Sequence, residues 1–256
     1  MMQGVIVVVL YLAVLIGVRL ALDPDAELWD STSQGAFDYM APVAAAVAAV
    51  LILVGVMGWY SRYILYERPE LRLTGPKWLW VIPALFVLSA IGGLAAAPWD
   101  DFETGTLLIL FVGAMLIGVG EELTVRGYLL TAARGRYTEA GACFFSSFLF
   151  AVLHFFGIIG GEAVGETITQ VVLAFFAGLS FYVIRRLTGS LFVGIVIHGL
   201  FDFAAFTGNG PGEGEEALDP PGLFLLPVIV MWIVTLVALY LIFRKKNTST
   251  APAPAT

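Results

Sequence analysis

The chain has 256 residues, of which 59% are hydrophobic and 13% charged, and it combines a formal net charge of −7 with a mean hydropathy of +0.91. A soluble domain of this length could not bury so much apolar surface, so the composition excludes a soluble globular protein and indicates a polytopic membrane protein. The single cysteine, Cys143, excludes an internal disulfide and a cysteine-rich metal site. The acidic balance gives no sign of nucleic-acid binding.

Eight apolar segments approach the roughly 20 residues that a helix needs to cross the hydrocarbon core of a bilayer. In chain order they are residues 4–22, 37–59, 78–97, 106–130, 140–158, 168–184, 190–206 and 223–243. Strands of a closed β-barrel would be about half as long and would alternate in polarity. We therefore expect an all-α bundle of about eight transmembrane helices, built as a single domain over residues 1–246. The Ala- and Pro-rich segment 247–256 is expected to be a disordered tail.

The loops between these segments alternate in charge. Basic residues follow the second, fourth, sixth and eighth segments, at Arg62, Arg68, Arg72, Lys77, Arg134, Arg136, Arg185, Arg186, Arg244, Lys245 and Lys246. The other loops carry only acidic charges, at Asp23, Asp25, Glu27, Asp30, Asp100, Asp101, Glu103, Glu162, Glu166, Glu213, Glu215, Glu216 and Asp219. Because basic loops stay on the cytoplasmic side of a membrane, both termini are expected in the cytoplasm.

Three charged residues, Glu121, Glu122 and Arg126, lie near the end of the fourth apolar segment. Ionisable groups at membrane depth indicate a functional site. Glu122 and Arg126 have the i,i+4 spacing of a helical ion pair, whereas Glu121 is rotated by about 100° from Glu122. We expect Arg126 to hold Glu122 and to leave Glu121 free to act as a general base. The alternative is an interfacial position, where both acids are hydrated and Arg126 snorkels to the surface.

Both histidines of the chain also fall in apolar segments. Phe150 precedes His154 by four residues, and Asp202 follows His198 by four. A carboxylate one helical turn away can fix the tautomer and orientation of an imidazole. With Thr138 as the expected N-cap of its helix, His154 comes about 6 Å deeper than Glu121, a difference that helix tilt can absorb. The alternative is structural: a packed histidine and a His–Asp pair that ties helices together.

These motifs, taken in order, resemble those of the CAAX protease and bacteriocin-processing family of intramembrane endopeptidases, also called the Abi family. The Glu-Glu-x-x-x-Arg motif matches at Glu121, Glu122 and Arg126. The Phe-x-x-x-His motif matches at Phe150 and His154, and the His-x-x-x-Asn/Asp motif at His198 and Asp202. The resemblance covers about residues 80–206, and it implies a multi-pass protein of a prokaryotic cell membrane.

The resemblance implies hydrolysis of a peptide bond within the membrane. Glu121 would activate the water, His154 would help to hold it, and Arg126 would position the acids. His198 and the residue at position 202 would stabilise the tetrahedral oxyanion. Members that process prenylated proteins have asparagine at this last position. An ionised Asp202 cannot donate a hydrogen bond, so it is either kept protonated by burial or only orients His198.

Other functions remain open from the residues alone. A zinc-dependent protease could use Glu121, His154, His198 and Asp202 as ligands. Without a His-Glu-x-x-His helix, however, we expect a reaction that needs no metal or other cofactor. A non-catalytic immunity or scaffold protein would bind a peptide or membrane partner in the same cavity, and a proton-coupled transporter would use the buried groups as a relay. The expected partners are a membrane-associated or lipid-modified protein or peptide and membrane lipid, with no nucleic acid.

Overall fold

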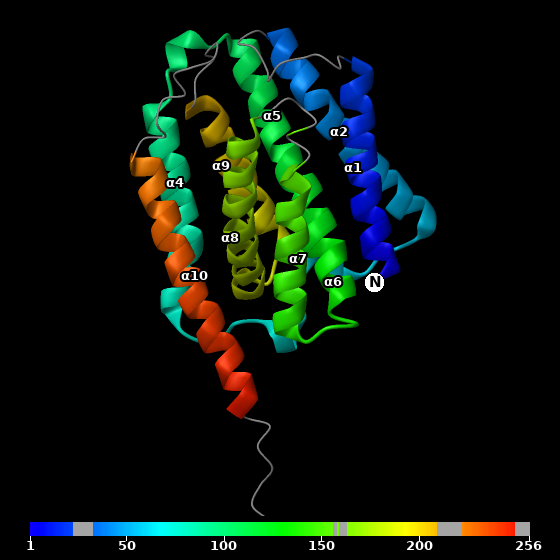
Figure 1. The fold of residues 1–256 in the computed structure, drawn as a ribbon, viewed down its shortest axis with the longest axis vertical. Helices are drawn as coiled ribbons and strands as arrows, with labels where there is room; N and C mark the ends of the chain where they lie inside the picture. The colour runs from blue at the N-terminus through cyan, green and yellow to red at the C-terminus, as the bar shows by residue number, and fades with distance from the viewer. Residues whose placement is uncertain (23–32, 156–157, 159–162, 209–221, 249–256) are drawn as a thin grey trace, which may run out of the picture.

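The computed structural model describes residues 1–22, 33–155, 158, 163–208 and 222–248. The described residues form a bundle of long helices joined by short connections (Figure 1). Within that part of the chain there is no β-strand, and an isolated bridge between Tyr66 and Ser190 is the β-type pairing found. The expected all-α class is confirmed.

The long helices are α1 (Met2–Leu22), α2 (Ser33–Met57), α4 (Val81–Ala96), α5 (Thr104–Glu121), α7 (Glu139–Leu153), α8 (Val164–Thr188), α9 (Leu191–Gly208) and α10 (Gly222–Thr248). Helix α5 continues without a break into the π-helical segment η4 (Glu122–Leu129) and then α6 (Leu130–Ala133). The connections contain the short helices α3 (Arg62–Leu65), η1 (Pro69–Leu71), η2 (Lys77–Trp80) and η3 (Trp99–Asp101).

Each of the eight predicted segments is helical, and seven of the described helices are long and apolar enough to cross a membrane. The exception is α7, an apolar helix of 15 residues. The prediction of a helix over 140–158 was too long, because the α-helix ends at Leu153 and the backbone N–H of His154 turns back toward the carbonyl of Ala151. Thr138 caps the start of α7 as expected, since its side chain accepts a hydrogen bond from Gly141 N. The protein is an integral multi-pass membrane protein.

Successive long helices run in opposite directions, so the connections alternate between the two ends of the bundle (Figure 1). The N-terminus, the α2–α4 connection and the α6–α7 and α8–α9 turns lie at one end, and the acidic η3 lies at the other. This arrangement agrees with the predicted alternation of charge, while a cytoplasmic position of the basic end stays a prediction. The acidic residues expected in 23–32, 159–162 and 209–221 lie outside the described residues. Helix α10 runs to Thr248, two residues into the predicted tail, and residues 249–256 lie outside the described part.

The helices pack in a row in the order α1, α2, α5, α9, α4 and α10, and α7 and α8 cover one side of this row. Segment η4 lies at the centre, where it contacts α1, α3, α7, α8 and α9. A charged sequence at this position is therefore surrounded by protein rather than lipid. All eight residues of η4 are buried.

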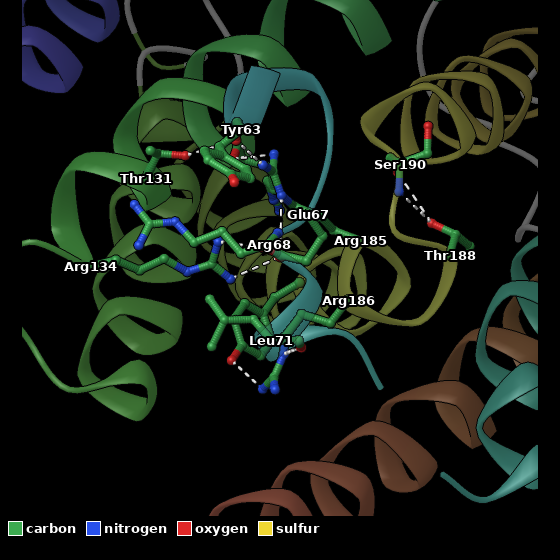
Figure 2. A network of polar contacts seen from close by, with 12 residues as sticks. Tyr63, Glu67, Arg68, Leu71, Thr131, Arg134, Arg185, Arg186, Thr188 and Ser190 are labelled. Atoms are coloured by element: carbon green, nitrogen blue, oxygen red, sulfur yellow. Dashed lines mark hydrogen bonds and ion pairs between the residues drawn. The ribbon is translucent and has the colours of Figure 1, made fainter. Parts of the chain in front are cut away.

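A network of buried charges lies at the basic end of the bundle, and Figure 2 shows its polar contacts. Arg134 forms two hydrogen bonds with the carboxylate of Glu67, at 2.8 and 2.9 Å, and contacts Glu139 at 2.8 Å. Burial alone would raise the pKa of Glu67, but the hydrogen bonds and charge of Arg134, together with the charge of Arg185, hold this pKa below its usual value. The network joins the α2–α4 connection to α6, α7 and α8.

The sequence placed Arg185 and Arg186 in a basic loop, and this interpretation is wrong. Both residues lie in the last turn of α8, and both are buried. Arg186 donates to the carbonyl of Leu71 at 2.6 Å and to the hydroxyl of Tyr182 at 2.8 Å. The extended connection between α2 and α4 supplies carbonyl groups to these guanidinium groups, which is why they are buried rather than hydrated.

Candidate active site

The site begins where the α-helix widens. Glu121 is the last residue of α5, and Glu122 is the first residue of η4. The backbone N–H of Leu130 bonds to the carbonyl of Val125, five residues earlier, which is the spacing of a π-helix. Such wide turns are rare and occur frequently at functional sites. The sequence showed no sign of this turn, because the surrounding residues fit an ordinary apolar helix.

Two glycines let α5 and α9 approach closely beside this turn. A Cβ atom on Gly118 would lie 2.6 Å from the carbonyl oxygen of Ile195, and one on Gly199 would lie 2.9 Å from the Cα of Met115. Neither position has room for a larger residue, because each Cβ would meet a backbone atom of the facing helix, and the one on Gly199 would also meet the side chain of Met115. The close contact brings the acids that follow Gly118 next to His198, the neighbour of Gly199.

The expected ion pair is present. Nη1 of Arg126 lies 3.1 Å from Oε1 of Glu122, and each side chain is 1% exposed. Nδ1 of His198 lies 3.1 Å from the same oxygen. Since an ionised carboxylate can only accept, Nδ1–H of His198 donates to Glu122. Glu122 thus links η4 to α9, a contact that the sequence did not predict.

Arg126 is enclosed by aromatic rings as well as by Glu122. Its guanidinium carbon lies 4.1 Å from the ring centroid of Phe150 and 5.5 Å from that of Phe181. Gly178 leaves the space for this group, because a Cβ there would lie 3.2 Å from Nη2 of Arg126. Cation–π contacts of this kind hold a buried guanidinium in place. The interfacial alternative, with Arg126 reaching the surface, is therefore wrong.

The second ring nitrogen of His198 faces two further acids. Nε2 lies 3.6 Å from Oε2 of Glu121 and 3.5 Å from Oδ2 of Asp202. These distances are longer than ordinary hydrogen bonds, so Nε2 faces both acids without a hydrogen bond to either. The ring of Phe181 stacks on the imidazole at 4.8 Å, which fixes the plane of the ring. His198 is consequently held through Glu122 and Phe181, and its Nε2 is directed at Glu121 and Asp202.

His154 is less closely joined to this group. Its Nδ1 lies 2.9 Å from the carbonyl oxygen of Phe150, so this nitrogen carries the proton, and a neutral ring keeps Nε2 as an acceptor. The ring of Phe150 packs edge-on against both His154, at 4.9 Å, and His198, at 6.1 Å. Among the described residues no hydrogen bond or ion pair joins His154 to Glu121. The structure therefore connects His154 to the site through Phe150. It brings together the other six predicted site residues, which are Glu121, Glu122, Arg126, Phe150, His198 and Asp202.

The positions of the side chains bear on the metal alternative. Across the described ranges of the chain, no three His, Cys, Asp or Glu side chains form a group that could hold a metal ion. The zinc ligands considered from the sequence are Glu121, His154, His198 and Asp202, and within the described residues no hydrogen bond or ion pair joins His154 to the other three. Around His198 the structure places the carboxylates of Glu121 and Glu122 and the buried guanidinium of Arg126.

Sequence patterns did not identify two residues of the site, Phe181 and Arg185. Phe181 is one of 19 phenylalanines, and nothing in its neighbourhood distinguishes it. Arg185 could have been found, because it lies at the end of an apolar helix where a charge needs partners. Its guanidinium donates to the carbonyls of Arg126 at 2.6 Å, Tyr63 at 2.7 Å and Ile64 at 3.1 Å. It thereby connects the network of Figure 2 to the backbone of η4.

Comparison with known proteins agrees with this geometry. Residues 103–204 match the model of the type II CAAX prenyl endopeptidase Rce1-like family. A search of curated proteins found no match. The matched residues run from the start of α5 into α9 and contain the three motifs, so the resemblance predicted from the sequence is confirmed, over a shorter range than the expected 80–206. Over residues 103–204 this multi-pass membrane protein is thus similar to the Rce1-like family of type II CAAX prenyl endopeptidases.

Proposed function

We propose that the protein hydrolyses a peptide bond in a membrane-associated or lipid-modified protein or peptide, using a water molecule that Glu121 activates. One observation carries this proposal. Of the two adjacent acids, Glu122 is held by both Arg126 and His198, whereas Glu121 forms no ion pair with Arg126 and lies opposite Nε2 of His198. A base needs an available carboxylate, and Glu121 provides it.

The steps follow from these positions. A water between Glu121 and the substrate gives a proton to the carboxylate as its oxygen attacks the peptide carbonyl carbon. The carbonyl oxygen becomes an oxyanion, to which Nε2–H of a protonated His198 donates. Glu121 then returns the proton to the leaving nitrogen as the C–N bond breaks. His154, with Nε2 as an acceptor, helps to orient the water.

In this proposal Asp202 does not donate to the oxyanion, as an asparagine at this position would. Its Oδ2 lies 3.5 Å from Nε2 of His198, on the same side as Glu121. An ionised Asp202 favours the protonated form of His198, which is the form that can donate to the oxyanion. Asp202 therefore acts on the reaction through His198, and the absence of an amide at this position does not remove the donor.

Purified protein in detergent, incubated with a library of peptides, tests this function. New peptide termini that appear with wild type and are lost in Glu121→Gln are the expected result. Glu166→Gln, at an exposed acid in the first turn of α8, is the matched control and should cleave like wild type. Binding of peptides without cleavage would instead support the scaffold function.

Metal dependence is tested in the same assay. We propose that no metal is needed, so dialysis against a zinc chelator should leave cleavage unchanged, and elemental analysis should find less than one metal ion per chain. Stoichiometric zinc, with activity that is lost on chelation and restored on adding zinc, would establish the metal-dependent mechanism instead.

A further inference from the structure

One buried polar group near the site is not used by the residues discussed so far. Tyr11 lies on α1 and is 2% exposed. Its hydroxyl has no hydrogen-bond partner within the described part of the chain. Burying a hydroxyl without a partner costs folding free energy, and groups of this kind in native proteins call for an explanation.

The position of Tyr11 relates this hydroxyl to the site. A Cβ atom on Gly120 would lie 2.6 Å from Cε2 and 2.8 Å from the hydroxyl oxygen of Tyr11. The hydroxyl therefore lies against the backbone directly before Glu121. It is also within range of the charges of Glu121 and Asp202.

The packing of α1 explains how the ring reaches this place. Gly4, two turns earlier on α1, lies against the backbone of Leu129, because a Cβ atom on Gly4 would be 3.0 Å from the Cα of Leu129. Gly4 and Tyr11 are seven residues apart, which is two helical turns, so they lie on one face. That face of α1 runs along η4 and the end of α5, from Leu129 to Gly120.

We propose that Tyr11 is a catalytic residue whose hydroxyl donates a hydrogen bond to the oxyanion of the tetrahedral intermediate. This inference rests on the proposed function. As the water oxygen bonds to the carbonyl carbon, the π electrons move to the carbonyl oxygen, and the Tyr11 O–H donates to it without losing its proton. A buried hydroxyl that is unpaired before the reaction is suited to this part, because it gains a partner when the oxyanion forms.

The hydroxyl supplies what the side chain at position 202 does not. An ionised Asp202 cannot donate to an oxyanion, so His198 would otherwise be the single donor. Tyr11 is a neutral donor from a different helix. It lies outside residues 103–204, so the match to the family does not include it.

The test compares Tyr11→Phe with wild type on a cleaved peptide. The variant should lower kcat by about a hundredfold, the usual effect of removing one oxyanion donor, and should leave KM close to wild type. The melting temperature should stay the same or rise, because no hydrogen bond is lost. Tyr128→Phe is the matched control: it removes a hydroxyl that donates to the carbonyl of Trp59 at 3.0 Å, so it should lower the melting temperature and leave kcat unchanged.

A second measurement separates an oxyanion donor from a structural residue. A phosphinate analogue of the cleaved peptide mimics the tetrahedral intermediate, so Tyr11→Phe should weaken its binding by the same factor as kcat/KM. Glu121-dependent cleavage with a wild-type kcat in Tyr11→Phe would overturn this proposal alone. A lower kcat with unchanged phosphinate binding would overturn it as well. A wild-type protein that cleaves no peptide would overturn the proposed function together with it.

Discussion

Oε1 of Glu122 lies 3.1 Å from Nη1 of Arg126 and 3.1 Å from Nδ1 of His198, so one carboxylate oxygen serves a cation of η4 and an imidazole of α9. The neighbouring acid, Glu121, forms no ion pair with Arg126 and faces the other ring nitrogen of His198, Nε2, at 3.6 Å. Under the proposed function the two glutamates of one motif have separate tasks: Glu122 holds the site together and Glu121 takes part in the reaction. This division can be measured, because the two tasks respond differently to the same substitution.

The first prediction compares Glu122→Gln with Glu121→Gln. Glu122→Gln removes the charge that balances buried Arg126, and breaking a buried pair in this way costs about 3–5 kcal/mol. We expect a clear fall in melting temperature in detergent together with loss of activity. Glu121→Gln should instead lower kcat by at least about a hundredfold while the melting temperature stays near wild type.

The double variant Glu122→Gln/Arg126→Met provides the control for the ion pair. Because it removes both charges, it should recover part of the stability that Glu122→Gln loses. If Glu122→Gln melted like wild type and Glu121→Gln did not, the assignment of the two acids would have to be exchanged.

The second prediction concerns Asp202. From the sequence alone, Asp202→Ala would leave His198 without a partner, but the structure gives His198 a second partner in Glu122. We therefore expect Asp202→Asn to keep much of the activity, because Glu122 still favours protonated His198 and the new amide can itself donate. Asp202→Ala should lose less than His198→Ala. His198→Ala removes a proposed oxyanion donor and should cost roughly a hundredfold or more in kcat. An Asp202→Asn variant as inactive as His198→Ala would show that the negative charge itself is needed.

The third prediction concerns the approach of α5 to α9. Gly118→Ala places a Cβ atom where the carbonyl oxygen of Ile195 would be 2.6 Å away, so the helices must separate. Overpacking of this kind costs about 1–3 kcal/mol, and here it also moves Glu121 away from His198. Melting temperature and kcat should both fall. Gly17→Ala is the matched control, because nothing lies within 4 Å of a Cβ on Gly17 of α1, and it should behave like wild type.

Much of the bundle could be predicted from the sequence, because a membrane requires about 20 apolar residues for each crossing. The i,i+4 pair of Glu122 and Arg126 was also predictable, since both residues belong to one helix. The end of α7 at Leu153 was not, because nothing in its apolar sequence specifies a stop. The contact of Glu122 with His198 depends on how two helices pack, and no pattern within either helix contains that information.

The ion pairs at the basic end of the bundle could not be predicted from the sequence either, because they depend on contacts between distant segments. From the sequence, Arg134 and Arg185 are interpreted only as basic loop residues beside a membrane. Their partners come from Glu67 and the carbonyls of the α2–α4 connection, more than fifty residues away in the chain. Tyr11 was missed for a similar reason, since its relation to Glu121 exists only after α1 packs along η4.

The last prediction concerns Glu67, which lies outside the spans and binds Arg134 through both oxygens. Its pKa in the folded protein is below the usual value, because the hydrogen bonds and charge of Arg134 outweigh the effect of burial. A carboxyl group with a lowered pKa stabilises the fold at neutral pH, and this contribution is lost as the pH falls through the folded pKa. We expect the melting temperature of wild type in detergent to fall on acidification below about pH 4.5, the region where an unperturbed glutamate takes up its proton.

Glu67→Gln should have a lower melting temperature than wild type at pH 7 and should lose less on acidification, because the group that titrates is absent. Glu70→Gln, at an exposed acid three residues along the same connection, is the matched control and should follow the wild-type curve. Breaking a buried ion pair costs about 3–5 kcal/mol, so the difference at pH 7 should be well resolved. Since Arg185 reaches both Glu67, at 3.5 Å, and the carbonyl of Arg126, Glu67→Gln should also reduce cleavage through the position of η4. Parallel acid curves for Glu67→Gln and wild type would show that this carboxylate does not carry the pH dependence.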